Sequence, residues 1–313
     1  MTKSSMNGLQ AFISAEWLRS VPHEVETAAE AIASKYGDSV EGVIFYGSCL
    51  RTGEIIDKIL DFYVIVDSYR EAYDGAALAI ANKILPPNVF YHEIMVGDVT
   101  VRSKYAVLSL ADLEFRTSEN CLNVSVWARF CQPCMLLAAK NDNSRNQIAV
   151  AIAQAVSTMF RNFLHLEPEA RASRELWVGA FEQTYAAELR SERWGKGLEI
   201  YLLDQDRYDK LTLIALAALG LDVEPAPVLH QPSRTRKWRP RLKWAARRWN
   251  GKIVSFLRLV KATATFDGGI DYLAWKISRH SGVEIEIKDW MRKHPIIAGV
   301  SLFWSLRKEG AFK

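Results

Sequence analysis

Apolar runs separated by glycine, proline and short polar stretches divide the first 110 residues into alternating strands and helices. Runs rich in β-branched and aromatic residues predict strands at 42–46, 60–66, 88–96 and 100–108. Ala-rich segments with good helix formers predict helices at 25–36 and 70–84. We therefore expect a mixed sheet with flanking helices, a fold of the α/β (α+β) class.

The run 100–108 alternates clearly enough to assign its two faces. Successive side chains of a strand point to opposite sides of the sheet. One face should carry Val101, Ser103, Tyr105 and Val107, and the other Arg102, Lys104, Ala106 and Leu108. Lys104 is therefore expected on the face opposite Tyr105.

Beyond residue 110 the apolar spacing becomes helical. The helix-period patterns and further helix candidates cover 123–137, 147–163, 175–187, 198–204 and 208–219. Pro225-Ala226-Pro227 then interrupts the pattern as a linker. We divide the chain into a sheet domain over 1–115, a helical domain over 116–225 and a C-terminal region over 226–313.

The most informative motif lies at the end of the first predicted strand. That strand ends in Gly47-Ser48, and the next strand carries one acidic residue, Asp61. A glycine lets backbone N–H groups approach a phosphate, a serine hydroxyl adds a donor, and a nearby carboxylate can hold Mg²⁺ against a triphosphate. This arrangement is typical of a nucleotidyltransferase active site, so we assign catalysis to the domain 1–115. The alternative is a buried strand pair with a tight turn, in which Asp61 only bonds locally.

Two further carboxylates are candidates for a second metal ligand. Asp67 ends the strand that holds Asp61. Glu93 lies on the third predicted strand and faces either the site or solvent. Because Mg²⁺ is commonly held by one or two carboxylates together with substrate phosphates, we expect the metal ligands among Asp61, Asp67 and Glu93.

Three basic residues are candidates for binding phosphate groups. Lys104 would neutralise the triphosphate or the attacking phosphate, unless it is an edge-strand lysine that discourages aggregation. Arg129 would meet the acceptor phosphate, unless it only forms an ion pair among the helices. Arg51, one turn after Ser48, is a further candidate for the nucleotide phosphates. Catalysis should then depend on Asp61, Lys104 and Arg129.

Composition limits the other possible chemistries. The chain has 313 residues, a net charge of +4 and four cysteines, too few for a disulfide scaffold of this length. Cys131 and Cys134 lack the second pair, or the histidines, that a zinc site needs. The N-terminus lacks a signal-peptide pattern, and the apolar runs 211–221 and 296–306 are shorter than the ~20 residues of a membrane span. We expect a cytoplasmic protein without a transmembrane helix.

Positive charge is concentrated after the linker. Residues 234–261 contain eleven Lys or Arg and no Asp or Glu. One helical face of this segment is apolar and consists of Leu242, Ala246, Trp249, Ile253, Phe256 and Val260. A basic amphipathic helix with tryptophans suits a membrane surface that carries anionic lipid. Two alternatives stay open: the helix packs on the core with a solvated basic face, or it binds a nucleic acid backbone.

Several of these motifs together resemble one known family. The matching segments are Tyr46-Gly47-Ser48, Leu60-Asp61-Phe62, Val66-Asp67, Lys104–Ser109, Asp112-Leu113 and the pair Arg129 and Pro133. In order and spacing they are similar to the Tam41 family of mitochondrial-type phosphatidate cytidylyltransferases, over about residues 40–215. Tyr63 occupies the position where the broader nucleotidyltransferase superfamily has a second acid.

The resemblance implies a reaction, a cofactor and a location. CTP and phosphatidic acid would give CDP-diacylglycerol and pyrophosphate, with Mg²⁺ required. A bacterial relative would be peripheral on the inner face of the plasma membrane, with phosphatidic acid in an anionic membrane surface as its partner and nucleic acid less favoured. Two other functions stay open: a nucleotidyltransferase that acts on nucleic acid or protein, and a catalytically lapsed protein that binds nucleotide and membrane.

Overall fold

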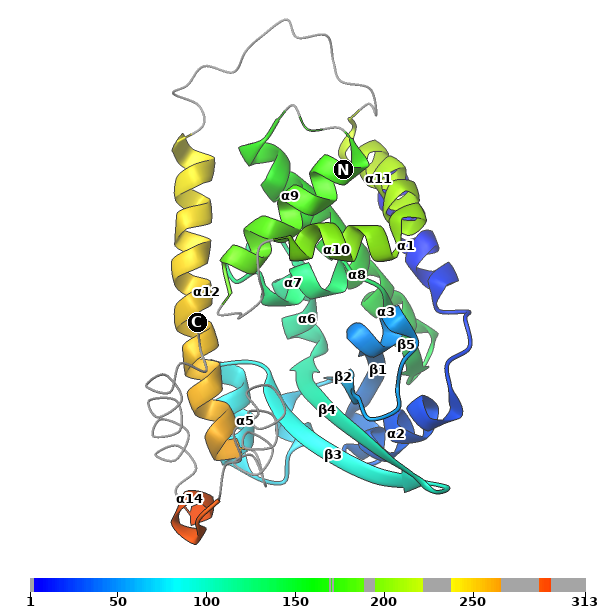
Figure 1. Ribbon diagram of the computed structural model, residues 1–313, viewed down its shortest axis with the longest axis vertical. Helices are drawn as coiled ribbons and strands as arrows, with labels where there is room; N and C mark the ends of the chain where they lie inside the picture. Colours follow the sequence, from blue (N-terminus) through cyan, green and yellow to red (C-terminus); the bar gives the residue numbers. More distant parts are fainter. Residues whose placement is uncertain are drawn as a thin grey trace, which may run out of the picture.

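A five-stranded mixed sheet with helices on both faces forms the centre of the protein, and the expected α/β class is confirmed (Figure 1). The computed structural model describes residues 3–168, 170, 172–188, 195–221, 238–265 and 287–293. The strands lie in the order β3-β4-β2-β1-β5. Their bounds are β1 (Val40–Tyr46), β2 (Ile59–Val66), β3 (Asn88–Val96), β4 (Val99–Ser109) and β5 (Cys134–Ala139).

Three of the four strand pairs are antiparallel, and the sequence predicts four of the five strands. β1 pairs antiparallel with both β2 and β5, β3 and β4 form an antiparallel hairpin, and β2 and β4 run parallel. The four strands expected before residue 110 are confirmed. The helix expected over 123–137 is wrong, because only α7 (Ser125–Phe130) is helical there and β5 follows it. Periodicity cannot distinguish a six-residue apolar strand from a buried helical segment.

One face of the sheet is covered by short helices from the N-terminal half of the chain. They are α2 (His23–Ala33), α4 (Tyr69–Ala72) and α5 (Ala76–Ile84), and α2 packs most closely on the strands. The core on this side includes Val101, Tyr105 and Val107 of β4, as their alternation predicted. Ala106 and Leu108 lie in the core of the other side, so both assigned faces of β4 are confirmed.

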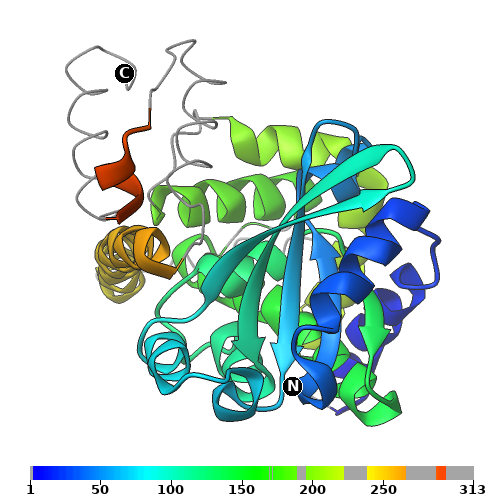
Figure 2. The ribbon, with the colours of Figure 1, turned by 90° about the horizontal axis from the view of Figure 1, so that it is seen from below.

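The larger core lies between the other face of the sheet and a layer of helices (Figure 2). These helices are α1 (Lys3–Glu16), α6 (Leu110–Thr117), α7, α8 (Asp142–Leu166), α9 (Ser173–Ala186), α10 (Lys196–Leu203) and α11 (Gln205–Leu219). α8 is the central helix of this layer, and α1 packs against both α8 and α11. A buried ion pair connects α1 and α11, the first and last helices of this layer in chain order. Arg207 of α11 donates to both carboxylate oxygens of Glu16 in α1, at 2.6 and 3.0 Å.

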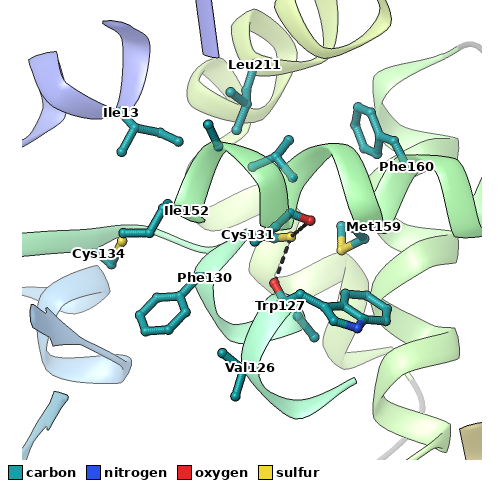
Figure 3. Close-up of a cluster of buried hydrophobic side chains, with 14 of the residues drawn as sticks. Ile13, Val126, Trp127, Phe130, Cys131, Cys134, Ile152, Met159, Phe160 and Leu211 are labelled. Atoms are coloured by element: carbon teal, nitrogen blue, oxygen red, sulfur yellow. Dashed lines mark hydrogen bonds between the residues drawn. The ribbon is translucent and has the colours of Figure 1, made fainter. Parts of the chain in front are cut away.

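The four cysteines are buried and unbridged, so the structure gives them a packing role. The Cys131 thiol donates to the carbonyl of Trp127 at 3.0 Å within the larger core (Figure 3). Burial raises the pKa of the Cys134 thiol to about 12. Thiols held protonated in this way are poor nucleophiles and poor metal ligands.

The basic segment forms a long helix, α12 (Trp238–Thr265), on one side of the molecule (Figure 1). It contacts α8 and β3, and a short helix, α14 (Asp289–Lys293), follows later in the chain. Of the expected C-terminal region, 226–237, 266–286 and 294–313 lie outside the described residues. Within the described ranges, no helix combines the length and apolar character that crossing a bilayer requires.

Candidate active site

Strand register brings four polar or aromatic side chains into one row across the sheet. Tyr46 of β1 is opposite Asp61 of β2, Asp61 is opposite Lys104 of β4, and Lys104 is opposite Tyr91 of β3. The row faces the larger helical layer, because Tyr63 and Ala106, two residues further along β2 and β4, lie in that core. We call Tyr46, Asp61, Lys104 and Tyr91 the polar row.

Asp61 and Lys104 form the charged centre of the polar row. The Lys104 Nζ lies 2.9 Å from the Asp61 Oδ1. The Lys104 side chain is 38% exposed, so its charge can be reached from solvent, whereas the Asp61 side chain is 15% exposed with its Oδ1 buried, so this carboxylate is only partly accessible. Lys104 is not an edge-strand lysine, since β4 lies between β3 and β2.

The Gly47 turn presses the backbone against this carboxylate. Gly47 has a φ of +94°, a conformation that L side chains rarely adopt, and α3 (Ser48–Thr52) begins directly after it. A Cβ on Gly47 would lie 2.6 Å from the Asp61 Oδ2. Only glycine lets the turn that carries Ser48 approach Asp61 so closely.

Arg129 reaches the same face of the sheet from α7. Its guanidinium donates to the Tyr63 hydroxyl at 3.1 Å and lies 5.4 Å from the centre of the Tyr46 ring. The two tyrosine rings are 5.2 Å apart and together form a platform for the cation. Tyr63 of β2 thus contacts the arginine that the sequence analysis expects to meet the acceptor phosphate.

Arg51 of α3 lines a cleft of about 340 Å³. It donates to the Gln132 Oε1 at 2.9 Å, while its buried Nε has no hydrogen-bond partner among the described residues. The lining includes Arg19 and Arg51 together with Glu16 and Asp204. Arg51 is therefore close to the Gly-Ser turn but is held toward a neighbouring cleft.

The structure does not bring the other two candidate carboxylates to Asp61. Asp67 follows the far end of β2, six residues or about 20 Å along the strand, where it accepts a hydrogen bond from the Ser68 backbone. Glu93 shares the face of Asp61 but lies two strands away, and it pairs with Arg102 at 3.3 Å and Tyr91 at 2.6 Å. Direct ligation of one ion by Asp61 and either residue does not fit this geometry.

The residues present fit a metal ion that arrives with its substrate. Across the described residues, no group of three or more His, Cys, Asp or Glu side chains could hold a metal ion alone. A single accessible carboxylate is sufficient for Mg²⁺ when phosphate oxygens and water supply the remaining ligands. Asp61 offers that carboxylate next to a turn that can accept phosphate.

The sequence interpretation missed the aromatic part of the site. The sequence identifies Tyr46 only as part of a motif and Tyr91 only as a strand residue, although strand register places both beside the charged pair. Counting pairs outward from the hairpin between β3 and β4 would have placed Tyr91 opposite Lys104. The contact between Tyr63 and Arg129 has no such local signal, because it joins residues 66 positions apart.

Comparisons with known proteins add little to this geometry. No family model matches the sequence, and no curated protein matches it. Among solved structures, the chain is similar to a nucleotidyltransferase-like protein from Exiguobacterium sibiricum, with 14% identity over 91% of this chain and 92% of that one, at a TM-score of 0.28. At that TM-score the likeness carries no weight, and the function has to be argued from the residues of the site.

Proposed function

We propose that the polar row and the Gly47 turn form the active site of a magnesium-dependent nucleotidyltransferase. The observation that carries the proposal is the contact of the Gly47 turn with Asp61, which is itself paired with Lys104. A close backbone turn, a partly accessible carboxylate and a lysine in one row supply the groups that a magnesium nucleoside triphosphate requires. The pattern of Gly47, Ser48 and Asp61 in the sequence supports the same conclusion.

In this proposal each residue has a defined role. The Gly47 turn and the Ser48 hydroxyl bind the β- and γ-phosphates, and Arg51 contributes positive charge from the neighbouring cleft. Asp61 holds Mg²⁺, which would neutralise the triphosphate and polarise the α-phosphorus. Lys104 donates a hydrogen bond to a phosphate oxygen when the nucleotide binds, and its ion pair with Asp61 weakens at the same time.

The proposed acceptor is a phosphate monoester bound by Arg129. An oxygen of this monoester forms a bond to the α-phosphorus while the bond to the bridging oxygen breaks and pyrophosphate leaves. A phosphate monoester is already anionic at neutral pH, so the residues need to position and neutralise charge rather than remove a proton. Arg129, fixed by Tyr63 and Tyr46, is suited to this because guanidinium groups bind phosphate through two parallel hydrogen bonds.

The more specific proposal is that CTP and phosphatidic acid give CDP-diacylglycerol. It is supported by the sequence resemblance to the Tam41 family and by the position of Arg129, whose guanidinium lies on the face of the sheet that carries the polar row. Location on the inner face of the plasma membrane belongs to the same proposal. A nucleic acid or protein acceptor is the alternative that the test below has to separate.

The experiment measures pyrophosphate release by the full-length protein with Mg²⁺ and each of the four nucleoside triphosphates, with and without phosphatidic acid. We expect release with CTP and only with phosphatidic acid present. Asp61→Asn should lower kcat by about a thousandfold, since the metal-binding charge is lost. Asp98→Asn, in the exposed turn between β3 and β4, is the matched control and should leave the rate unchanged.

Other outcomes lead to different conclusions. Release that does not depend on lipid would refute the lipid acceptor and keep the nucleotidyltransferase assignment. Nucleotide binding without release, for every acceptor tried, would refute catalysis and favour a lapsed nucleotide-binding protein.

A further inference from the structure

The cleft that Arg51 lines is formed by four segments that lie far apart in the sequence. They are the end of α1 with the residues after it, α3, the start of β5 and the junction between α10 and α11. Its volume of about 340 Å³ lies within the range of small-molecule sites, which is roughly 300–1,000 Å³. We call it the Arg51 cleft. No residue of the polar row lines it, so its contents are a separate question from the nucleotide chemistry.

The Arg51 cleft contains two cations and one carboxylate that form no ion pair with any described residue. The side chains of Arg19, which is exposed, and of Asp204, which is half-buried, make neither a hydrogen bond nor an ion pair within the described ranges. Arg51 donates to the Gln132 Oε1 at 2.9 Å, but this amide is neutral and leaves the charge of the arginine uncompensated. The unpaired charges are therefore two positive and one negative.

The fold keeps the negative charge apart from the positive ones. Asp204 is held at the junction between α10 and α11, where its backbone N–H donates to the Tyr201 carbonyl at 3.3 Å. Glu16 also lines the cleft, but Arg207 occupies both of its carboxylate oxygens. Burial raises the pKa of the Asp204 carboxyl despite the nearby Arg207. Asp204 is thus the one lining carboxylate, among the described residues, that is available to a cationic group of a ligand.

Apolar side chains line the same cleft. Leu50 comes from α3, Met135 from β5 and Leu203 from the end of α10. Leu203 is 49% exposed, although large apolar side chains are mostly buried in this protein. A ligand with an apolar part would remove this surface from water.

We propose that the Arg51 cleft binds an α-amino acid with an apolar side chain. Its carboxylate would lie between Arg19 and Arg51, its ammonium group against Asp204, and its side chain on Leu50 and Leu203. A free phosphate would be repelled by the aspartate and a simple amine by the two arginines, whereas a zwitterion is attracted at both ends. This inference goes beyond the proposed function and does not rest on it.

The test measures binding to the full-length protein by isothermal titration calorimetry without nucleotide. The probes are L-leucine, N-acetyl-L-leucine, which has no ammonium group, and L-leucinamide, which has no carboxylate. The variants are Asp204→Asn and Arg19→Gln. Their matched controls are Asp98→Asn and Arg70→Gln, the same changes at exposed positions away from the cleft.

We expect the wild type to bind leucine at least about tenfold more tightly than either analogue, because each analogue lacks one charge-assisted contact. Asp204→Asn should weaken leucine binding at least about tenfold and leave the binding of N-acetyl-leucine unchanged. Arg19→Gln should weaken leucine binding by about threefold, since Arg51 remains, and leave leucinamide binding unchanged. Both control variants should bind leucine as the wild type does.

Three results would overturn the inference. The first is a wild type that binds none of the three probes. The second is an Asp204→Asn protein that loses leucine and N-acetyl-leucine equally, since no ammonium group would then be bound there. The third is an Asp204→Asn protein that loses affinity for CTP as much as for leucine, because the cleft would then hold the nucleoside part of the nucleotide.

The two proposals fail separately. Leucine binding is measured without nucleotide, so it stands even if no pyrophosphate is released with any acceptor. Arg19 is exposed and unpaired, so Arg19→Gln tests the carboxylate contact in a folded protein even if Asp204→Asn has a lower Tm. Unchanged leucine binding in Arg19→Gln and in Asp204→Asn alike would also overturn the inference.

Discussion

The polar row and the exposed apolar side chains of α12 are two opposite exceptions to the rule that apolar side chains are buried and polar ones exposed. The exposed apolar side chains of α12, which we call the α12 stripe, are Trp238, Leu242, Trp249, Ile253, Phe256 and Leu257. The polar row places the ion pair of Asp61 and Lys104 on two inner strands of the sheet, and next to it the Tyr63 hydroxyl accepts a hydrogen bond from Arg129 of helix α7. The α12 stripe places large apolar side chains on the outside of a helix that buries cations. A buried polar side chain can find its hydrogen-bond partners within the same chain. An exposed apolar surface is removed from water only when another molecule covers it.

The two longest helices of the described residues, α8 and α12, differ in which of their faces is buried. α8 buries its apolar residues in the larger core, including Ile148, Ile152 and Phe160. α12 has a comparable apolar periodicity but turns that face outward and buries Trp244, Arg247 and Gly251. Helical periodicity therefore identifies an apolar face without telling which neighbour covers it.

Gly47→Ala should have the largest effect, because it disturbs the polar row at its closest contact. The new Cβ would meet the Asp61 Oδ2 at 2.6 Å and displace the carboxylate. Since a misplacement of this size commonly costs about a hundredfold in rate, we expect kcat for pyrophosphate release to fall at least that far. Gly53→Ala is the control for an alanine at a positive φ: its φ of +73° and ψ of −1° lie in the left-handed helical region, which costs less than the backbone conformation of Gly47, and no atom lies within 4 Å of the added Cβ. Equal losses in the two variants would attribute the effect to strain alone.

Gly251→Ala should loosen the docking of α12 and leave the polar row intact. In a helix, alanine is favoured over glycine by about 1 kcal/mol, so an undocked helix would gain stability from the change. Here the Cβ would lie 1.9 Å from a backbone oxygen of Ala187, and the helix has to move away. We expect a net loss of about 1–3 kcal/mol in the free energy of unfolding, measured by denaturant titration, and faster proteolysis within α12.

The control for this variant is Gly8→Ala in α1, where the nearest atom is a side-chain methyl carbon, the Ile214 Cγ2, at 3.3 Å rather than a backbone oxygen at 1.9 Å. That variant should be close to neutral. A stabilised Gly251→Ala protein would contradict the tight docking of α12.

Arg247→Met should have the smallest effect and the opposite sign. The Arg247 side chain is fully buried against α12's own Trp244, and its guanidinium nitrogens have no hydrogen-bond partner among the described residues. Burial lowers the pKa of this guanidinium, as expected for an uncompensated charge. Methionine fills a similar volume without the charge, so the free energy of unfolding should stay equal or rise by up to about 2 kcal/mol. Lys243→Met, an exposed change on the same helix, should alter it little, and a clear loss in Arg247→Met would mean that the arginine has an acceptor.

Local sequence pattern is sufficient to predict four of the five strands and about half of the residues that make up the candidate site. Alternation along β4 placed Lys104 and Tyr105 on opposite faces, and the Gly-Ser turn and Asp61 were recognised from spacing alone. β5 was missed because six apolar residues fit a strand or a buried helix equally well. The separation of Asp67 from Asp61 and the direction of the α12 stripe depend on strand length and tertiary packing, which no short window of sequence contains.

The ion pair between Glu16 and Arg207 also bears on how the protein is made. It joins residues 191 positions apart, and α1, which ends at Glu16, packs on α11, which contains Arg207. At synthesis rates of about 5–20 residues per second, the ribosome needs roughly 10–40 s after making α1 before its partner helix exists. Until α8 and then α11 have been made, the apolar face of α1 lacks the helices that cover it in the folded protein, so the larger core closes late in translation.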